Sequence, residues 1–272
     1  MKNARFMKIA GRTATSKTPA CKGRARKTVA RKSKAKKSKL NTKKLFAIAD
    51  THLSFTADKP MCVFGDRWKN HSERLASAWR EEVSEDDTVI IAGDISWALK
   101  FADALADIDF LHKLPGKKIL VRGNHDLWWQ KITQLNQLYE DMRFLQNDHV
   151  FFDGEVAVCG SRGWGLPGLE DYGQGDEKIL ARELIRLEMS LGRAKEAEAK
   201  DIVCVLHFPP ALKPENTSPF TELIGRYPVS QVVYGHLHGP QAFGKGIMGE
   251  HGGVDYRLVS LDYLDFRPLR IV

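Results

Sequence analysis

Five short apolar stretches of this sequence each end in residues that can bind a metal ion. Each stretch has the length and apolar character of a buried strand, and Asp, Asn or His follows it within a few residues. In chain order, these following residues are Asp50 and His52, then Asp94, then Asn124, then His207, and finally His236 and His238. Because open α/β sheets place their sites at the carboxyl ends of the strands, we expect these side chains to meet at one rim.

Carboxylate oxygen, amide oxygen and imidazole nitrogen together suit borderline divalent ions such as Mn²⁺, Fe²⁺, Zn²⁺ or Ni²⁺. No cysteine stands at these turns, which argues against a structural zinc site. The set is too large for one tetrahedral ion, but it suffices for two ions about 3.5–4 Å apart that share one carboxylate. Such pairs hydrolyse phosphate esters, so the residues predict a phosphoesterase with two divalent metal ions, of which Mn²⁺ is the one we expect to serve in vitro.

The run Gly123-Asn124-His125-Asp126 offers further catalytic groups. A hydroxide that bridges the two ions would attack phosphorus, because metals lower the pKa of water from 15.7 towards about 7. His125, beside Asn124, is placed to protonate the leaving oxygen or to stabilise the transition state, and we expect Asp126 to hold its imidazole by a hydrogen bond. The predicted substrate is a phosphomonoester or a phosphodiester, with nucleotides among the candidates.

The motifs Asp-x-His, Gly-Asp, Gly-Asn-His-Asp, a single His and Gly-His-x-His, in this order, resemble the calcineurin-like metallophosphoesterase superfamily from about Leu45 to the C-terminus. Residues 46–54, 93–97 and 123–129 further resemble a bacterial group of predicted phosphohydrolases. The resemblance implies a β-sandwich flanked by helices. It also implies one metal ion on Asp50, His52 and His238, and a second on Asn124, His207 and His236, with Asp94 bridging them.

Each motif taken alone has an ordinary structural explanation. Gly-Asn-His-Asp could be a turn with a capping aspartate, and a lone histidine such as His207 is more often a hydrogen-bonded core residue than a ligand. Five motifs in the right order, each behind a strand, outweigh coincidence.

Two arginines are candidate substrate-binding residues. Arg122 occupies the position of a phosphate-contacting arginine in the phosphoprotein phosphatases of the superfamily, although a surface salt bridge is an equal alternative. Those enzymes carry Asp-Arg-Gly where this chain has Ile-Ser-Trp after Gly93-Asp94, so protein phosphatase activity is not expected. Arg162 lies beside Trp164, a pairing suited to a planar substrate group, as is Arg67 beside Trp68. The favoured alternative is that both tryptophans anchor loops in the core.

Elements of alternating type must position these residues. Strands are expected at residues 45–49, 88–92, 118–121, 150–152, 156–159, 202–206, 231–234 and 257–261. Helices are expected from Ser72 as N-cap, and at about 98–114, 130–139 and 176–200. The predicted fold class is α/β, a four-layer α/β/β/α sandwich of two mixed sheets flanked by helices.

The charge is distributed unevenly along the 272 residues. Of the 42 lysines and arginines, 17 lie in residues 1–44, which contain no Asp or Glu, so 25 basic residues accompany 34 acidic ones in the rest. We expect residues 1–43 to be a disordered basic tail and residues 44–272 to be the phosphoesterase domain. The tail could bind nucleic acid, serve as a transit peptide, or be a solvated extension, which is slightly favoured.

Two alternative functions follow from the tail. One is a nuclease whose basic tail concentrates nucleic acid. The other is a non-catalytic nucleic-acid-binding protein with a vestigial metal site.

The sequence also indicates the cellular compartment. Its four cysteines are scattered without CxxC spacing, as expected for free thiols in a reducing cytosol. No apolar run approaches the ~18 residues needed to cross a bilayer, and no signal-peptide core is present. We therefore expect a cytoplasmic protein without a membrane partner, and the sequence leaves its oligomeric state open.

Overall fold

The first sheet of the computed structural model contains five strands in the order β11-β1-β2-β3-β4. The model describes residues 43–167 and 172–272. The four parallel strands are β1 (Leu45–Ile48), β2 (Thr88–Ala92), β3 (Lys117–Val121) and β4 (Met142–Phe144), and β11 (Leu269–Arg270) lies antiparallel at the edge. β1 and β2 are buried along their whole length, as expected for parallel strands that are covered on both faces.

The second sheet contains six strands in the order β5-β6-β7-β8-β10-β9. Its parallel strands are β6 (Val156–Ser161), β7 (Asp201–Leu206), β8 (Val229–Tyr234) and β10 (Val254–Leu258). The edge strands β5 (His149–Phe151) and β9 (Gly249–His251) are antiparallel to their neighbours. The strands expected at 150–152 and 156–159 are therefore present as β5 and β6, which form a hairpin around Asp153.

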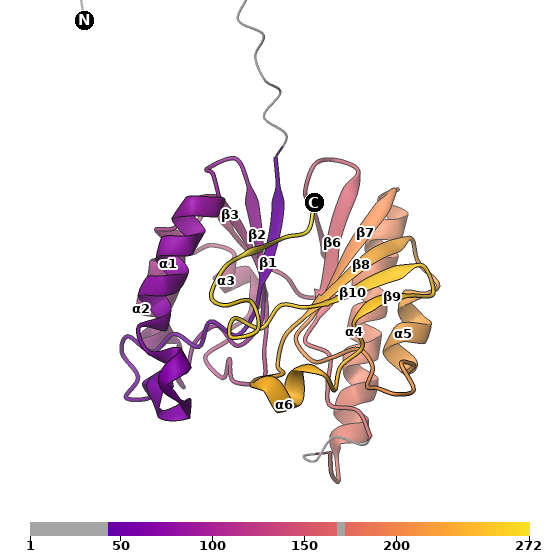
Figure 1. The fold of residues 1–272 in the computed structure, drawn as a ribbon. Coiled ribbons are helices and arrows are strands. Elements are labelled where there is room, and N and C mark those ends of the chain that lie inside the picture. The colour runs from indigo at the N-terminus through magenta and orange to yellow at the C-terminus, as the bar shows by residue number, and fades with distance from the viewer. Residues whose placement is uncertain (1–42, 168–171) are drawn as a thin grey trace, which may run out of the picture. The chain divides into compact units, whose positions relative to one another are not determined.

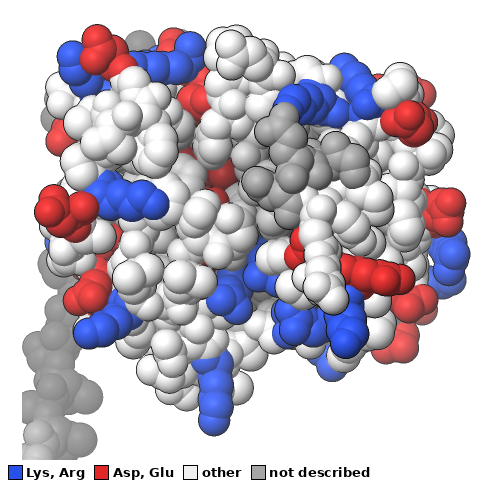
Figure 2. All heavy atoms as spheres, turned by 90° about the horizontal axis from the view of Figure 1, so that it is seen from below, with Lys and Arg blue, Asp and Glu red and all other residues white. Residues whose placement is uncertain are grey.

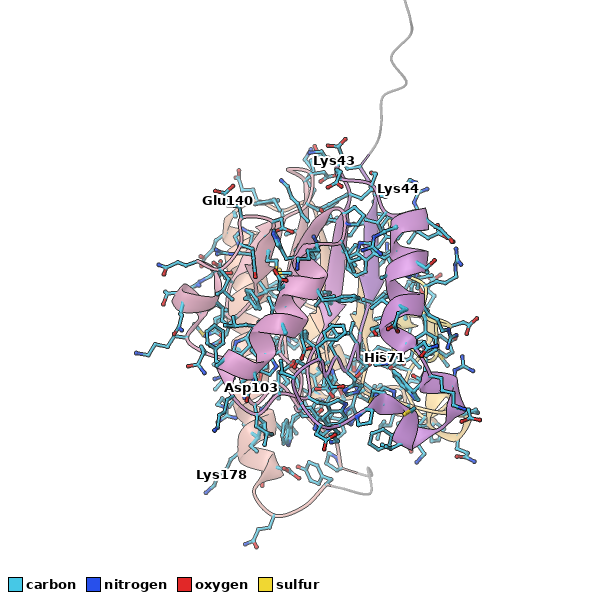
Figure 3. The ribbon with its side chains drawn as sticks, turned by 90° about the vertical axis from the view of Figure 1, so that its left-hand side faces the viewer. Lys43, Lys44, His71, Asp103, Glu140 and Lys178 are labelled. Atoms are coloured by element: carbon cyan, nitrogen blue, oxygen red, sulfur yellow. The ribbon has the colours of Figure 1, made fainter. Side chains whose placement is uncertain are left out.

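Helices cover the outer faces of the two sheets (Figure 1). α1 (His71–Glu82) and α2 (Phe101–His112) cover the first sheet, and Figure 3 shows them crossing in front of it. α4 (Asp176–Glu196) and α5 (Pro219–Ile224) cover the second sheet. The short helices are η1 (Met61–Phe64), η2 (Asp66–Trp68), α3 (Ile132–Leu135) and α6 (Pro240–Phe243).

Three apolar clusters hold these layers together. One lies between the two sheets and includes Ile90, Ile119, Val203 and Val233. The second packs the helices on the first sheet, and the third packs α4 and α5 on the second sheet. The arrangement is the predicted four-layer α/β/β/α sandwich of two mixed sheets.

Two helix predictions differ from the structure. Helix α1 begins at His71, because Asn70 adopts the left-handed conformation in front of it, so Ser72 lies inside the helix. The helix expected at 130–139 is reduced to α3. Asn136 ends it, since its side chain donates to the Phe144 carbonyl at 3.1 Å and accepts from the Phe144 N–H at 2.7 Å, which ties the chain to the unpredicted strand β4.

The three cysteines among the described residues are all free thiols. Cys159 and Cys204 are buried free thiols, as predicted, Cys62 is an exposed one, and Cys21 lies outside the described residues. Among the helices described, none has the length and apolar character needed to span a bilayer.

Candidate metal centre

All seven predicted ligands lie on loops that follow the carboxyl ends of strands. Asp50 and His52 follow β1, Asp94 follows β2 and Asn124 follows β3, all in the first sheet. The remaining ligands, His207 after β7 and both His236 and His238 after β8, come from the second sheet. These strand ends lie at the lower side of Figure 1, which Figure 2 views directly.

Asp50, His52 and His238 form one group whose ligand atoms all lie within 4.8 Å of one another. The Nε2 atoms of His52 and His238 are 3.2 Å apart, and Asp50 Oδ1 lies 3.5 Å from His238 Nε2. This is the ligand set that the resemblance implies for the first metal ion.

A second group consists of Asp50, Asp94 and His207, again with ligand atoms within 4.8 Å. His207 Nε2 lies 3.4 Å from Asp94 Oδ2 and 2.7 Å from Asn124 Oδ1. His236 Nδ1 lies 3.1 Å from the same Asn124 oxygen. Asp94 Oδ2 is also 3.9 Å from His52 Nε2, so its carboxylate approaches both groups.

The backbone at these loops is unusual. Asp50, His52, Asp94 and His236 have φ values of 60°, 43°, 51° and 71°, in the left-handed region that residues other than glycine seldom adopt. Such strained positions cluster at functional sites, where the surrounding structure holds them in place.

Two glycines of the motifs allow the carboxylates to approach. A Cβ atom on Gly123 would lie 2.1 Å from Asp94 Oδ1, and one on Gly235 would lie 2.4 Å from Asp50 Oδ2. Any larger residue would therefore displace a predicted ligand. This close approach gives a physical reason for glycine before Asn124 and before His236.

Hydrogen bonds fix the tautomers of two histidines. His207 Nδ1 donates to the Ala92 carbonyl at 3.0 Å, because a carbonyl oxygen can only accept. His238 Nδ1 lies 3.0 Å from Asp262 Oδ1, which accepts in the same way. In both residues Nε2 is left facing the cluster, as in metal-binding histidines that a carbonyl or carboxylate orients from behind.

Burial lowers the pKa values of two histidines in the cluster, whereas nearby carboxylates raise the pKa values of two others. Burial lowers the pKa of His52 and of His236 to about 3, so both imidazoles are neutral. Burial also opposes the charged form of His207, but Asp94 outweighs it and raises the pKa of His207 to about 9. For His238, Asp50 and Asp262 likewise outweigh burial and raise the pKa to about 10.

The donor set fits divalent cations. Two carboxylates, one amide oxygen and four imidazoles converge, and His52, Asp94 and His207 are almost completely buried. His52 Nδ1 is in addition a buried nitrogen without a hydrogen-bond partner among the described residues. A cluster of this kind can hold a cation, because the lone pairs face one another across short gaps.

His125 lies at the rim of this cluster. Its imidazole is 45 % exposed, with Nε2 3.9 Å from Asp94 Oδ2 and its ring centroid 4.3 Å from that of Trp97. Burial lowers its pKa. The side chain is therefore close to the candidate ligands and also open to a bound substrate.

The expected hydrogen bond between Asp126 and the His125 imidazole was wrong. Asp126 Oδ1 accepts from the N–H groups of Ile95, Ser96 and the Trp128 indole, and Oδ2 accepts from Gly123 N at 2.8 Å. These bonds use the carboxylate to join the loops after β2 and β3. Burial, together with the charge of Asp94, raises the pKa of Asp126. Asp126 is thus placed to hold the loops rather than the His125 ring.

The structure places Arg122 and Arg162 beside Glu183 of α4, and not against the candidate ligands. Arg162 Nη2 lies 3.3 Å from Glu183 Oε1, and its guanidinium stands 4.2 Å from the Trp164 ring centre. Arg122 Nε donates to the Asp126 carbonyl at 3.2 Å and lines the same small hollow as Arg162. Substrate binding by either arginine stays a prediction, and this arrangement does not favour it.

Two residues of the site were missed in the sequence. Asp262 orients His238 and also accepts from Gly239 N at 2.9 Å, and Trp97 stacks on His52 with ring centroids 4.6 Å apart. Asp262 follows β10, so the signal that identified the predicted ligands, a polar residue behind a strand, was available for it too. Trp97 has no comparable signal, because only the fold brings it to His52.

The fold is an α/β sandwich of two sheets, and the candidate metal ligands lie together at the ends of its strands. The chain belongs to the calcineurin-like phosphoesterase family, which matches residues 43–240.

Sequence relatives match only part of the chain. The Gene 66 protein of Mycobacterium phage L5 is 35% identical over 78 residues, which are 29% of this chain and 37% of the phage protein. The Gene 66 protein of Mycobacterium phage D29 is 37% identical over 73 residues, or 26% and 36% of the two chains. The matched region thus spans little more than a third of the length of these relatives.

Solved structures are similar over more of the chain. TT1561 of Thermus thermophilus has a TM-score of 0.49 and 15% identity, with 72% of this chain and 82% of that chain covered. Phosphopantetheinyl hydrolase (PptH) from Mycobacterium tuberculosis has a TM-score of 0.44 and 18% identity, with 84% and 95% covered.

Proposed function

We propose that this protein is a metal-dependent phosphohydrolase that cleaves a phosphomonoester or phosphodiester with two divalent metal ions. The observation that carries the proposal is the convergence of donor atoms from five strand ends in two sheets, with His207 Nε2 2.7 Å from Asn124 Oδ1 and His52 Nε2 3.2 Å from His238 Nε2. Membership of the calcineurin-like phosphoesterase family supports the same reaction class.

The first proposed ligand set is the first of the two groups, and the second proposed set, taken from the family resemblance, has only His207 and the shared Asp94 in common with the other group, which also contains Asp50. Asp50, His52 and His238 would hold the first ion, Asn124, His207 and His236 the second, and Asp94 would be shared between them. Mn²⁺, Fe²⁺, Zn²⁺ and Ni²⁺ all suit this mixture of oxygen and nitrogen donors. When bound, such ions supply positive charge for the phosphoryl oxygens and an activated hydroxide at neutral pH.

His125 is the proposed proton donor to the leaving oxygen. Its ring is held between Trp97 and the Asp94 carboxylate, while its exposed side faces a cavity of about 530 Å³. A proton donor must reach the leaving oxygen directly or through one water, and this position allows it. Asp126 contributes indirectly, because it fixes the loop that carries Asn124 and His125.

Hydrolysis of nitrophenyl esters tests the proposal. The purified protein with Mn²⁺ should release p-nitrophenol from bis-p-nitrophenyl phosphate or p-nitrophenyl phosphate, and Asp94→Asn should abolish the activity. If the wild-type protein and this variant are equally inert with every divalent ion while DNA binding persists, the non-catalytic alternative replaces the proposal.

The basic tail favours a second candidate, a nuclease that concentrates nucleic acid through residues 1–43. The 17 basic residues among the first 44 are its support. Figure 2 counts against it, since Lys and Arg are interspersed with Asp and Glu on the viewed face and form no continuous basic groove among the described residues.

The thiols support the expected cytoplasmic location. Cys62, Cys159 and Cys204 are all free, which is typical of proteins in a reducing compartment.

A further inference from the structure

Two separate cavities flank the candidate metal centre. The first, of about 310 Å³, is here named the Trp164 cavity, and its lining includes Asn124, Trp164, Tyr172, Phe208 and His236. The second, of about 530 Å³, is named the Trp97 cavity, and its lining includes His52, Phe64, Trp97, His125 and His238. Both volumes fall in the range of ligand-binding sites, about 300–1,000 Å³.

The candidate ligands form the boundary between the cavities. Asn124 lines the Trp164 cavity and its neighbour His125 lines the Trp97 cavity, while His236 lines both. A phosphoryl group at the ligands would therefore have one cavity on either side.

Aromatic side chains line both cavities. Phe208 packs against His236 with ring centroids 4.1 Å apart, and the Trp164 indole is held by a 2.9 Å hydrogen bond to Asp176. On the other side, Trp97 stacks on His52 and lies 6.2 Å from Phe64. Aromatic surfaces bind planar or apolar groups, because a bound group shields the aromatic rings from water, which is favourable.

Charged residues in the linings are few and of both signs. The Trp164 cavity is lined by Lys245 and Asp176, and the Trp97 cavity by Arg67 together with the carboxylates Asp94 and Asp262. Neither lining has the run of cations that a nucleic acid backbone requires. The cavities suit ester groups of low charge.

Together with the proposed phosphoesterase function, on which this inference rests, the two cavities define the substrate class. We infer that the substrate is a phosphodiester whose two substituents occupy the two cavities, with the leaving group in the Trp97 cavity beside His125. A monoester would fill only one of them.

The position of His125 sets the direction of cleavage. Water oxygen bonds to phosphorus and its proton passes to solvent, the ester P–O bond on the Trp97 side breaks, and the leaving oxygen takes a proton from His125, which then regains one from solvent. The products are an alcohol or phenol from the Trp97 cavity and a phosphomonoester whose substituent occupied the Trp164 cavity.

Binding of two esters that have equal charge and a poor leaving group tests the Trp164 cavity. Diphenyl phosphate and methyl phenyl phosphate each have one negative charge, but only the first has a ring for each cavity. Calorimetry with the Mn²⁺-loaded protein should give about tenfold tighter binding of diphenyl phosphate. Trp164→Ala and, independently, Tyr172→Ala should remove this preference, whereas Trp164→Phe should retain most of it.

The kcat/KM values of two esters distinguish the roles of the two cavities. With bis-p-nitrophenyl and methyl p-nitrophenyl phosphate the leaving group is the same, so Trp164→Ala should lower kcat/KM for the first ester only. Phe64→Ala should lower kcat/KM for both esters, and Val63→Ala, at a 67 % exposed neighbour that is absent from the lining, should change neither.

Equal binding of the two phenyl esters, or a higher kcat/KM for p-nitrophenyl phosphate than for either diester, would overturn the diester inference and leave the phosphoesterase proposal standing. Failure to hydrolyse any ester with any divalent ion would overturn both.

Discussion

The Nε2 atoms of His52 and His238 lie 3.2 Å apart, although the two residues are separated by 186 positions in the sequence. Asp262 binds Nδ1 of His238, so the Nε2 atom of His238 points at that of His52. Two nitrogen lone pairs at this distance repel each other unless a positive charge lies between them. In the metal-free protein that charge is a proton, because carboxylates raise the pKa of His238 to about 10.

Metal affinity should therefore rise with pH between pH 6 and 8. His207 and His238, with pKa values of about 9 and about 10, are protonated over this range and must lose those protons to coordinate a metal. His52 and His236 are already neutral. Each proposed ion displaces one of these protons, so its binding should tighten by up to about tenfold per pH unit, and the binding of both ions together by up to about hundredfold.

Calorimetric titration of Mn²⁺ in buffers of different ionisation enthalpy measures both the affinity and the protons released. Affinity that does not depend on pH, with no proton release, would contradict the assignment of these histidines as ligands.

His125→Ala should lower kcat by about 10²–10³ and leave the metal content unchanged, because His125 is the proposed proton donor and lies outside the two ligand groups. The loss should be larger for phenyl esters than for p-nitrophenyl esters, since p-nitrophenolate leaves without a proton. The matched control is His251→Ala. His251 lies in β9, and its imidazole contacts the Met248 carbonyl. Equal losses for good and poor leaving groups would mean that His125 does not protonate the leaving oxygen.

Asp262→Asn should weaken metal binding by about 10–100-fold, because it removes the charge that orients His238 from behind. The fold should be retained, since asparagine keeps an oxygen that can accept from His238 Nδ1. Equilibrium dialysis with Mn²⁺ measures the change. Asp265→Asn, three residues away at an exposed ion pair with Arg74, should bind metal like the wild type. The prediction fails if both variants bind equally well.

Asp126→Asn should destabilise the protein by about 2 kcal/mol, as expected when a buried hydrogen-bond network loses an acceptor. Both carboxylate oxygens accept N–H groups, and an asparagine NH₂ group would face one of these donors. Urea unfolding measures the loss, with Asp86→Asn on the exposed turn before β2 as the control. An unchanged urea midpoint would show that Asp126 does not hold the two loops together.

The strand ends could be predicted from sequence because each combines an apolar run with a polar residue behind it. The backbone then brings Asp50 and Asp94 together whatever the details of the loops, since the parallel strands β1 and β2 end at the same edge of the first sheet. Side-chain orientation could not be predicted in this way. Asp126 was expected to face His125, but the backbone N–H groups of Ile95 and Ser96, 30 or more residues earlier, compete for it.

Helix ends were less predictable for a related reason. Asn136 ends α3 through bonds to Phe144, a long-range contact that local periodicity does not contain. The orientation of Arg162 likewise depends on an ion pair with Glu183, which the sequence presents only as one acid on an amphipathic helix.

A truncated protein that starts at Asn41 should hydrolyse small esters at the wild-type rate, because every proposed ligand lies within residues 50–238. It should lose salt-sensitive DNA binding if the 17 basic residues of the first 44 bind phosphates. Fluorescence anisotropy with labelled DNA at about 50 mM and about 200 mM salt is one suitable measurement. DNA binding that persists after truncation would assign that role to residues after the tail.

The proposed ligands come from both sheets, with β1, β2 and β3 on one side and β7 and β8 on the other. An ion held by Asp50 and His238 would cross-link the two halves of the sandwich, so a chain in which the halves have not yet docked would lack a complete site. Assembly of the fold and acquisition of reactivity would then be one event. A nascent or damaged chain whose two sheets have not docked would therefore have no active metal pair.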